Sequence, residues 1–222
     1  MISPKDLVPS FFNNTANSYD KIVKWTTFGR DKVWKREILK HLANEKKVLD
    51  LACGTGILTK QIAEKIPDAK IIGIDITASY LEKARRKLNL YQNILLVNQD
   101  AEKLELGERF DCITASYLPK YCDSKILIKN CIEHLNVGGK IILHDFTYPK
   151  NRFVRTMWNF YFDVLYLVGF FIPDWKKVFA DLPQIIRETD WVNDYENTMK
   201  KMGLNVHKQD LTGGSSTIIV GT

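Results

Sequence analysis

The chain has 222 residues, of which 45% are hydrophobic and 26% charged, a balance that suits one globular domain with a sizeable core. The net charge of +6 is compatible with an anionic partner, but the basic residues are spread along the chain without a dense basic block. We therefore expect no nucleic-acid partner. The most apolar long stretch, residues 153–172, contains Arg155 and Asp163, so we do not expect it to span a membrane.

The cysteine pattern argues against a metal or redox motif. No C-x-x-C pair occurs among Cys53, Cys112, Cys122 and Cys131, so neither a zinc knuckle nor a thioredoxin-type site is supported. Cys53 and Cys112 lie in apolar, strand-like segments, which favours free thiols in a reducing compartment. The first residues also lack the pattern of a signal peptide. We expect a cytoplasmic protein without a bound metal.

Residues 1–45 predict helices rather than strands. One helix is expected at Lys21–Trp25, and Asp31 is a candidate cap for a second helix that ends near Leu42. The apolar positions of this second helix recur at helical spacing, at Val33, Trp34, Ile38 and Leu42. We interpret this region as an N-terminal helical cover over a sheet.

Strand-like and helix-like segments then alternate. The expected strands are Lys47–Ala52, Lys70–Asp75, Ile94–Asn98, Phe110–Ser116 and Lys140–Phe146, with helices at Ile57–Ile66, Thr77–Leu90 and Asp123–Leu135 and a turn at Asn136–Gly139. This alternation predicts a parallel sheet with right-handed crossovers. Residues 190–202 predict a last helix, and residues 204–210 and 216–221 a closing hairpin. The fold class is therefore α/β, a Rossmann-like seven-stranded mixed sheet with helices on both faces.

The loop after the first strand carries the clearest functional signal. Gly54 and Gly56 let the backbone bend tightly and approach a ligand, because neither has a Cβ. A dinucleotide fingerprint needs Gly or Ala at the position of Thr59, and Asp50 would repel a pyrophosphate. A carboxylate there suits the sulfonium and ammonium groups of S-adenosylmethionine. We favour a methyl-donor site over a dinucleotide site or a purely structural turn.

Two further strand ends offer partners for such a donor. Asp75 ends the second strand about 20 residues beyond the glycine loop, where an acidic residue accepts hydrogen bonds from ribose hydroxyls. Asp100 and Ala101 follow the third strand, where a carboxylate and a backbone N–H can bind an adenine edge. Ser116 and Tyr117 close the fourth strand and are expected to face the methionyl end of the donor. The alternative for Asp75 and Asp100 is an ordinary turn residue.

These motifs resemble those of the class I S-adenosylmethionine-dependent methyltransferases. More narrowly, the chain resembles the C-methyltransferases of ubiquinone and menaquinone biosynthesis, the UbiE/MenG type. The features are Tyr19-Asp20, Gly29-Arg30, Trp34-Lys35, Phe146-Thr-Tyr-Pro149 and Asp210-Leu-Thr-Gly-Gly214. The resemblance covers nearly the whole chain and implies that S-adenosylmethionine is converted to S-adenosylhomocysteine.

The resemblance also implies which residues bind the donor. Carried over by position, they are Thr59, Asp75, Asp100, Ala101 and Ser116. With the residues of the glycine loop and its neighbours, the expected donor site further includes Tyr19, Asp50, Gly54, Gly56 and Ile76. Tyr19 is expected to help close a lid over the donor.

The sequence departs from the family pattern after the fourth strand. The family usually shows Ser-Phe-Gly-Leu-Arg-Asn, whereas this chain has Ser-Tyr-Leu-Pro-Lys-Tyr at residues 116–121. Lys120 stands in place of the Arg implicated in quinol activation, and Tyr121 in place of the Asn. Charge is kept, but the bidentate geometry of Arg is lost. Because ring-carbon methylation needs an ionised hydroquinone hydroxyl, the leading catalytic candidates are Lys120, Tyr121 and His144, although His144 could equally be structural. Asp145 and Tyr148 are further candidates for the group near that hydroxyl.

The alternation of strands and helices is interrupted at residues 150–190. We interpret this segment as an aromatic-rich insertion within a single domain of residues 1–222. Residues 153–171 suit a polyprenyl tail or a membrane surface, which would place the protein peripherally at a membrane. Alternatively, this segment packs on the domain or pairs two copies as a homodimer.

The hypothesis is a methyltransferase for a prenylated quinol. The alternatives are O- or N-methylation of another small molecule, or a non-catalytic donor-binding or membrane-associated protein.

Overall fold

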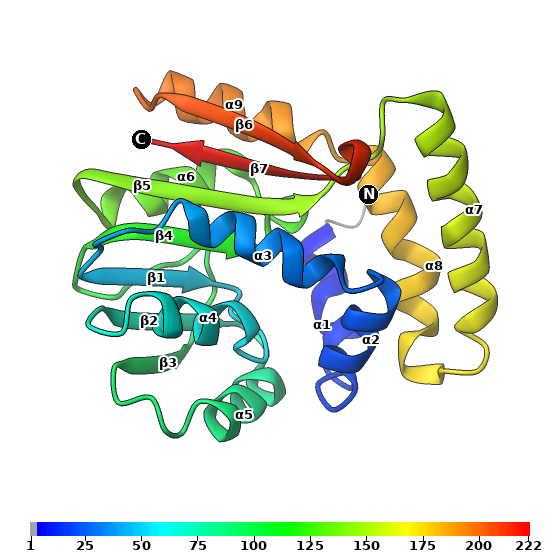
Figure 1. The fold of residues 1–222 in the computed structure, drawn as a ribbon, viewed down its shortest axis with the longest axis horizontal. Helices are drawn as coiled ribbons and strands as arrows, with labels where there is room; N and C mark the ends of the chain where they lie inside the picture. The colour runs from blue at the N-terminus through cyan, green and yellow to red at the C-terminus, as the bar shows by residue number, and fades with distance from the viewer. Residues whose placement is uncertain (1–3) are drawn as a thin grey trace.

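The computed structural model describes residues 4–222, and the first three residues lie outside the described part. A seven-stranded sheet with the order β3-β2-β1-β4-β5-β7-β6 runs through the molecule (Figure 1). The strands are β1 (Lys47–Leu51), β2 (Lys70–Asp75), β3 (Ile94–Asn98), β4 (Phe110–Ser116), β5 (Leu135–Phe146), β6 (Val206–Leu211) and β7 (Ser216–Gly221). β1 to β5 pair in parallel, whereas β7 is antiparallel to both β5 and β6. The predicted seven-stranded mixed sheet is confirmed.

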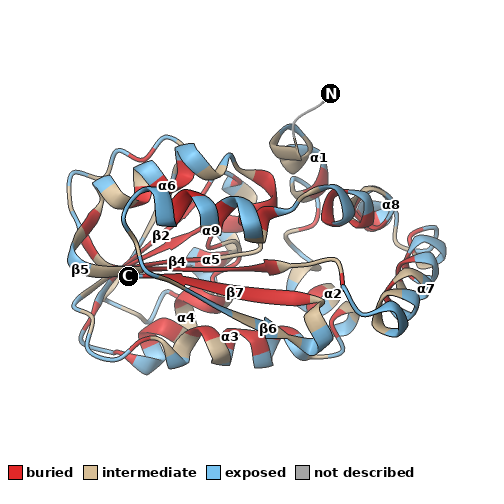
Figure 2. Ribbon diagram, turned by 90° about the horizontal axis from the view of Figure 1, so that it is seen from above, coloured by how far each residue is buried: buried red, intermediate tan, exposed pale blue. Residues whose placement is uncertain are grey.

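The helices form two layers and a separate group at one end. They are α1 (Val8–Phe12), α2 (Tyr19–Thr26), α3 (Arg30–Lys40), α4 (Ile57–Lys65), α5 (Ala78–Lys87), α6 (Ser124–Glu133), α7 (Arg152–Val168), α8 (Pro173–Glu188) and α9 (Trp191–Lys201), with 3₁₀ turns η1 (Pro4–Leu7), η2 (Pro119–Tyr121) and η3 (Thr212–Gly214). Figure 2 shows α3 and α4 on one face of the sheet and α6 and α9 on the other. Helices α1, α2, α7 and α8 lie beyond the carboxyl ends of the parallel strands (Figures 1 and 2). Across residues 4–222, no helix has the length and apolar character needed to cross a membrane.

The central strands are buried because helices cover both faces of the sheet. Val48, Leu49 and Leu51 of β1 are fully buried, as expected for a parallel strand with a continuous apolar run. Asp50 is the exception in β1, a buried carboxylate at the strand's carboxyl end. A buried carboxylate is unfavourable unless hydrogen bonds compensate for its lost hydration. The presence of Asp50 therefore indicates a functional site at this end of the sheet.

The glycine loop connects β1 to α4 and depends on glycine at its second position. Gly56 is the N-cap of α4 and has φ = 78°, in the left-handed region. A Cβ on Gly56 would lie 2.7 Å from Cδ1 of Leu88, so helix α5 leaves no room for a side chain there. The loop is therefore held against α5, with Gly54 directed to the carboxyl end of β2.

Two local predictions differ from the structure. Asp31 lies inside α3, and the N-cap of that helix is Gly29, with φ = 73°. Residues 136–139 form an irregularity within β5 rather than a turn before it, since the register shifts between Phe110 and Cys112. The aromatic-rich insertion, for which no elements were predicted from the sequence, contains two helices, α7 and α8, with Pro183 inside α8.

Candidate active site

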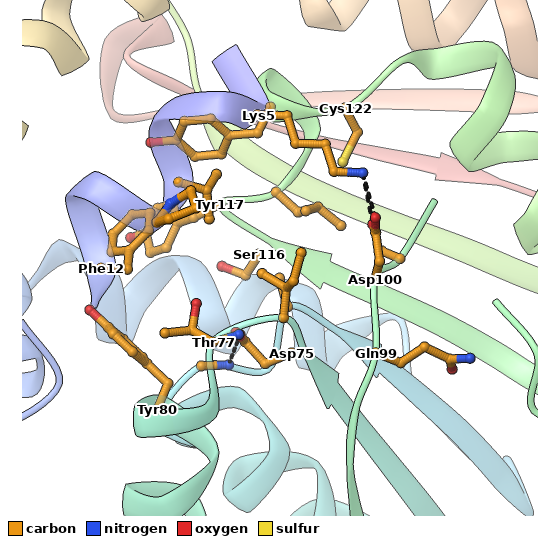
Figure 3. Close-up of a pocket in the computed structure, with 18 of the residues that line it drawn as sticks. Lys5, Phe12, Asp75, Thr77, Tyr80, Gln99, Asp100, Ser116, Tyr117 and Cys122 are labelled. Carbon is orange, nitrogen blue, oxygen red and sulfur yellow. Dashed lines mark hydrogen bonds and ion pairs between the residues drawn. The ribbon is translucent and has the colours of Figure 1, made fainter. Parts of the chain in front are cut away.

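A cavity of about 370 Å³ opens at the carboxyl ends of β1, β2, β3 and β4, and we call it the donor cavity. The sequence-predicted donor residues that line it are Tyr19, Gly54, Asp75, Ile76, Asp100, Ala101 and Ser116, and the catalytic candidate Tyr121 lines it as well. Thr77, Tyr80 and Gln99 complete its lower wall (Figure 3), while η1 and α1 contribute Lys5 and Phe12 from above. The fold therefore brings six separate segments to one opening: residues 5–12, 19, 52–54, 75–80, 99–101 and 116–122.

Asp75 binds the backbone of both loops that border the cavity. One carboxylate oxygen accepts from the Gly54 N–H at 2.8 Å, and the other accepts from the Thr77 N–H at 2.8 Å. Burial raises the pKa of Asp75, and these hydrogen bonds oppose that effect. The carboxylate thus fixes the glycine loop relative to the start of α5 while its edge remains in the cavity wall.

Asp100 is held by a lysine from the N-terminal turn. Lys5 Nζ lies 2.9 and 2.7 Å from the two oxygens of Asp100 and also pairs with Glu102, so the lysine reaches across the cavity from η1 (Figure 3). Partial burial opposes ionisation of Asp100, but the hydrogen bonds and charge of Lys5 lower its pKa overall. Lys5 was not among the residues predicted from the sequence. There was little indication of this contact in the sequence, because Lys5 lies 95 residues from Asp100 and belongs to no recognisable motif.

Asp50 lies beneath the glycine loop, at a small cleft beside the donor cavity. Its carboxylate accepts from Thr59 Oγ1 at 2.6 Å and from Thr114 Oγ1 at 2.9 Å. Burial raises the pKa of Asp50 to about 6, against these two hydrogen bonds. Thr59 is itself fully buried, so it supports Asp50 from below, in contrast with the expected direct contact to the donor. Gly56, likewise, shapes the loop against α5.

A second cavity of about 400 Å³ lies between α2, α7 and α8, and we call it the acceptor cavity. Its walls are mostly aromatic and aliphatic: Val23, Phe28, Trp34, Phe146, Trp158, Tyr161, Phe162, Leu165, Trp175, Val178, Phe179 and Leu182. Such a lining suits an apolar ligand, which a few polar groups can orient. The aromatic insertion therefore builds one wall of a cavity.

The two cavities share a wall of four aromatic side chains. Phe12, Tyr19, Tyr117 and Tyr121 line both of them. Phe12 contacts two of the other rings edge to face, with centroids 6.4 Å apart for Phe12–Tyr19 and 6.3 Å for Phe12–Tyr121. We call this set the aromatic partition. A group in one cavity and a group in the other can meet only beside these rings.

Lys120 forms a buried ion pair in the wall of the acceptor cavity. Its Nζ lies 2.7 Å from Asp145 Oδ1 and 4.3 Å from the centroid of the Tyr121 ring. Burial lowers the pKa of Lys120, and the charge of Asp145 opposes this effect. The predicted catalytic lysine is therefore at the acceptor cavity, already neutralised by a carboxylate.

His144 lies beneath the cavities rather than in their walls. Its side chain is fully buried on β5, with Nδ1 3.0 Å from Ser116 Oγ and Nε2 2.8 Å from Ser216 Oγ. Burial, with the nearby charges of Lys35 and Lys120, lowers its pKa well below the ordinary value. This neutral ring, which makes two hydrogen bonds, supports Ser116, and Ser116 does line the donor cavity. The geometry contrasts with the expected catalytic role and favours the structural alternative.

A further polar cluster had escaped the sequence reasoning. The Tyr117 hydroxyl donates to Asp31 Oδ1 at 2.8 Å, and the same oxygen accepts from Lys35 Nζ. Tyr117 has φ = 70°, and its ring stacks on Phe146 with centroids 4.9 Å apart. Asp31 and Lys35 show the i, i+4 spacing of a helical ion pair, but only the fold brings Tyr117 to them.

Comparisons with known proteins agree with this geometry. Residues 2–222 match the ubiE/COQ5 methyltransferase family. A demethylmenaquinone methyltransferase of Staphylococcus aureus (strain JH9) is 26% identical over 233 residues, which cover 98% of this chain and 93% of the relative.

Solved structures share the fold. A putative S-adenosyl-L-methionine-dependent methyltransferase from Methanococcus maripaludis has a TM-score of 0.67 at 18% identity, covering 96% of this chain and 93% of the other. The N-methyltransferase NodS from Bradyrhizobium japonicum WM9, in complex with S-adenosyl-L-homocysteine, has a TM-score of 0.57 at 11% identity, covering 87% and 86%. The family match decides the class: the chain belongs to the ubiE/COQ5 methyltransferase family and, as predicted from its sequence, is an S-adenosylmethionine-dependent methyltransferase.

Proposed function

We propose that the protein transfers the methyl group of S-adenosylmethionine to a ring carbon of a prenylated quinol, of the demethylmenaquinol kind. The observation that carries this proposal is the pair of cavities that meet at the aromatic partition, one polar-edged and one apolar. The relative from Staphylococcus aureus, named a demethylmenaquinone methyltransferase, supports the choice of acceptor.

The residues of the donor cavity fit the chemistry of S-adenosylmethionine. Asp75 offers a carboxylate edge to ribose hydroxyls, and Asp100 with the Ala101 N–H suits an adenine edge. Asp50 supplies negative charge near the sulfonium and ammonium groups, while Tyr19 and Ser116 border the methionyl end. When bound, the donor supplies an electrophilic methyl group. The protein's own contribution is to hold the acceptor ring at the partition, because alignment of the reacting atoms supplies much of the rate.

In the acceptor cavity, Lys120 and Tyr121 border the reacting end. The Lys120 ammonium is buried beside aromatic rings, and a cation there stabilises a developing phenolate more strongly than in water. Asp145 holds this ammonium in place and keeps its charge balanced before the acceptor binds. We therefore assign Lys120 electrostatic stabilisation of the ionised acceptor.

Donor binding is the first step to test. Isothermal calorimetry with S-adenosylmethionine should detect binding to the wild type and lose most of it in Asp75→Ala. Asp68→Ala removes an exposed carboxylate that precedes the amino end of β2, opposite the end that carries Asp75, so it is the matched control and should bind normally. Binding that survives Asp75→Ala would contradict the placement of the ribose contact. Absence of binding to the wild type would overturn any methyl-transfer role.

The acceptor is tested by incubation with methyl-labelled donor and a panel of demethylmenaquinols, demethoxy-type quinols and simple phenols. We expect label on a ring carbon of a prenylated quinol. Label found only in O-methyl or N-methyl products would favour the alternative class of small-molecule methyltransferase. Donor binding without any labelled product would favour the non-catalytic alternative.

We also propose that α7 rests on a membrane surface from which the prenyl tail enters. Exposed apolar residues recur along α7 and its end at spacings of three and four: Phe153, Met157, Phe160, Val164, Leu167 and Phe171. We call this set the α7 stripe. The opposite side of the same helix, with Trp158, Tyr161, Phe162 and Leu165, lines the acceptor cavity. One helix thickness thus separates the cavity from an exposed apolar face, a short path for an apolar tail.

Vesicle flotation tests this membrane contact. Phe160→Asp should weaken binding to anionic phospholipid vesicles, whereas Thr156→Asp adds the same charge to an exposed polar position on the same helix and should have a smaller effect. Analytical ultracentrifugation of the same proteins tests the alternative, a homodimer through the α7 stripe. If Phe160→Asp converts a dimer to a monomer and leaves vesicle binding unchanged, the stripe is a subunit interface.

A further inference from the structure

Tyr117 is the one residue of the aromatic partition whose hydroxyl the structure shows bound to a carboxylate. The carboxylate belongs to Asp31, which is 7% exposed, and Lys35, which is 4% exposed, pairs with the same oxygen. The Lys35 ammonium also lies 4.7 Å from the centroid of the Tyr117 ring. A buried acid, its counter-ion and a hydroxyl therefore form one cluster.

The backbone and the ring stacking fix the position of this hydroxyl. Tyr117 directly follows β4, its N–H donates to the His144 carbonyl at 2.8 Å, and its positive φ turns the chain away from the strand direction. The stack on Phe146, with an interplanar angle of 16°, holds the ring between the two cavities. Tyr117 lines the donor cavity, the cleft above Asp50 and the acceptor cavity. It therefore lies where an acceptor must face the donor.

The hydroxyl has the right hydrogen-bonding capacity for an acceptor's own hydroxyl. A phenolic O–H donates one hydrogen bond and can accept others. Because its hydrogen is directed to Asp31, the lone pairs of the Tyr117 oxygen remain for a donor on its other side. Burial, together with the negative charge of Asp31, raises the pKa of Tyr117 well above its ordinary value. The group therefore stays a neutral phenol and does not become a tyrosinate.

We propose that the Tyr117 hydroxyl takes up the proton of the quinol hydroxyl and passes its own proton to Asp31. This inference rests on the proposed function. The quinol O–H bond breaks as a new Tyr117 O–H bond forms, and the original Tyr117 O–H bond breaks as Asp31 becomes a carboxylic acid. The quinol is left as a phenolate, with its electron pair available to the ring carbon that is methylated. That carbon then loses its hydrogen to water as a proton, and the proton on Asp31 returns through Tyr117 to the product oxygen.

The relay involves the same charged neighbours at each stage. Lys35 balances Asp31 before transfer, and Lys120 lies 5.7 Å from the Tyr117 ring centroid, on the acceptor side. Tyr117 contacts the acceptor and is thus the catalytic residue, whereas Asp31 acts through it and is a positioning and proton-holding residue. The titratable groups that face Tyr117 from the elements around it are Tyr19, Asp31, Lys35, Lys120, His144 and Asp145.

The test begins with a wild type shown to methylate a demethylmenaquinol. Tyr117→Phe keeps the stack on Phe146 and removes only the hydroxyl, and Asp31→Asn keeps the shape of the acid. Each should lower kcat about 100-fold, in the range of general-base catalysis, while KM for the quinol rises by no more than about tenfold, the contribution of one hydrogen bond to binding. The double variant should be no worse than either single variant, because the two groups act as a unit. Donor binding by calorimetry should stay normal in all three, which also shows that they fold.

Tyr91→Phe is the matched control. It also removes a tyrosine hydroxyl that donates to a carboxylate, that of Glu64 at 3.0 Å, but Tyr91 lines neither the donor cavity nor the acceptor cavity. Its kcat should fall less than about threefold. As pH rises toward the ionisation of the quinol, near pH 10 for a simple phenol, the rate of Tyr117→Phe should approach that of the wild type. A structural defect would not be repaired by pH.

A binding measurement without the donor gives an independent readout. The wild type should bind 1-naphthol about three- to tenfold more tightly than 1-methoxynaphthalene, because only the naphthol can donate to Tyr117. Tyr117→Phe should lose this preference, and Tyr91→Phe should keep it. If the wild type methylates the quinol and Tyr117→Phe retains both full kcat and the naphthol preference, the relay is overturned. If the wild type methylates no quinol at all, the proposed function fails instead, and any naphthol preference then measures only a hydrogen bond.

Discussion

Replacement of Asp50 by Asn should stabilise the donor-free protein at neutral pH and weaken donor binding. Asp50 is 1% exposed, and burial raises its pKa to about 6 in the folded chain, compared with an ordinary value of 3.8. Asn has nearly the same shape, and the hydroxyls of Thr59 and Thr114 can rotate to satisfy its amide. The substitution therefore removes a buried negative charge and leaves the packing unchanged.

The magnitude follows from the pKa difference. At 1.36 kcal/mol for each pH unit, a rise from 3.8 to about 6 comes to about 3 kcal/mol at pH 7. The sign is unfavourable to the wild type: between these two values the folded state of Asp50 binds more protons than the unfolded state, so stability falls as pH rises. The wild type should lose this free energy between about pH 4 and pH 7, and Asp50→Asn should not.

Urea unfolding of the donor-free proteins at pH 4.5, 6 and 7 measures this effect. The excess stability of Asp50→Asn should grow with pH and approach about 3 kcal/mol at pH 7. Asp111→Asn is the control with the opposite sign, because hydrogen bonds from Asn136 and the Lys46 and Lys47 N–H groups lower the pKa of Asp111 despite partial burial. That variant should be less stable than the wild type at pH 7 and approach it at low pH.

Donor binding should change in the opposite direction. Loss of one charged partner should weaken S-adenosylmethionine binding about tenfold or more, since a hydrogen bond or contact to a charged group contributes about 1.5–3 kcal/mol. At pH 6, binding to the wild type should release protons, which calorimetry in two buffers of different ionisation enthalpy detects. The reasoning would be refuted by an Asp50→Asn protein that is less stable than the wild type at pH 7, or by an excess stability that does not vary with pH.

Two other substitutions test the architecture around the site. Lys120→Met should lower the free energy of unfolding by about 3–5 kcal/mol, because it leaves Asp145 buried and unpaired, and Lys120→Met with Asp145→Leu should recover most of that loss in urea unfolding. A Lys120→Met protein as stable as the wild type would show that the pair is hydrated. Gly56→Ala should cost about 1–3 kcal/mol more than Gly107→Ala, since both glycines have positive φ but only the Cβ at Gly56 meets Leu88. Equal melting temperatures for the two alanine variants would contradict the close packing of the loop on α5.

The donor side of the site could be predicted from the sequence because its residues follow buried strands directly. Once β1, β2 and β3 are recognised, Gly54, Asp75 and Asp100 must meet at one edge of the sheet. The family resemblance implied a donor contact for Thr59, but its position on α4 directs it under the loop to Asp50. The sequence predicts the position of a residue within a strand or helix, whereas the burial of its side chain depends on neighbours from other elements.

The acceptor side could be predicted only in outline. The aromatic composition of residues 150–190 suggested an apolar cavity or surface, and the structure contains both, on opposite sides of α7. The ion pair of Asp31 with Lys35 follows from their i, i+4 spacing, but the contact of Asp31 with Tyr117 could not be foreseen. The position of Asp31 before an apolar helical stretch is typical of an N-cap, yet Asp31 lies inside α3 and accepts a hydrogen bond from Tyr117, 86 residues away. Contacts of this kind arise from the packing of α3 on one face of the sheet, which no local pattern encodes.

The aromatic partition also has a thermodynamic consequence. Phe12, Tyr19, Tyr117 and Tyr121 form one wall for two ligands, so any adjustment of these rings by the first ligand is already made when the second arrives. The two binding equilibria are then coupled, and linkage requires the coupling to be reciprocal. Whatever factor the methyl donor adds to the affinity for the quinol, the quinol must add to the affinity for the donor. The spent donor, S-adenosylhomocysteine, would contact the same four rings and so would itself alter how tightly the methylated product is held.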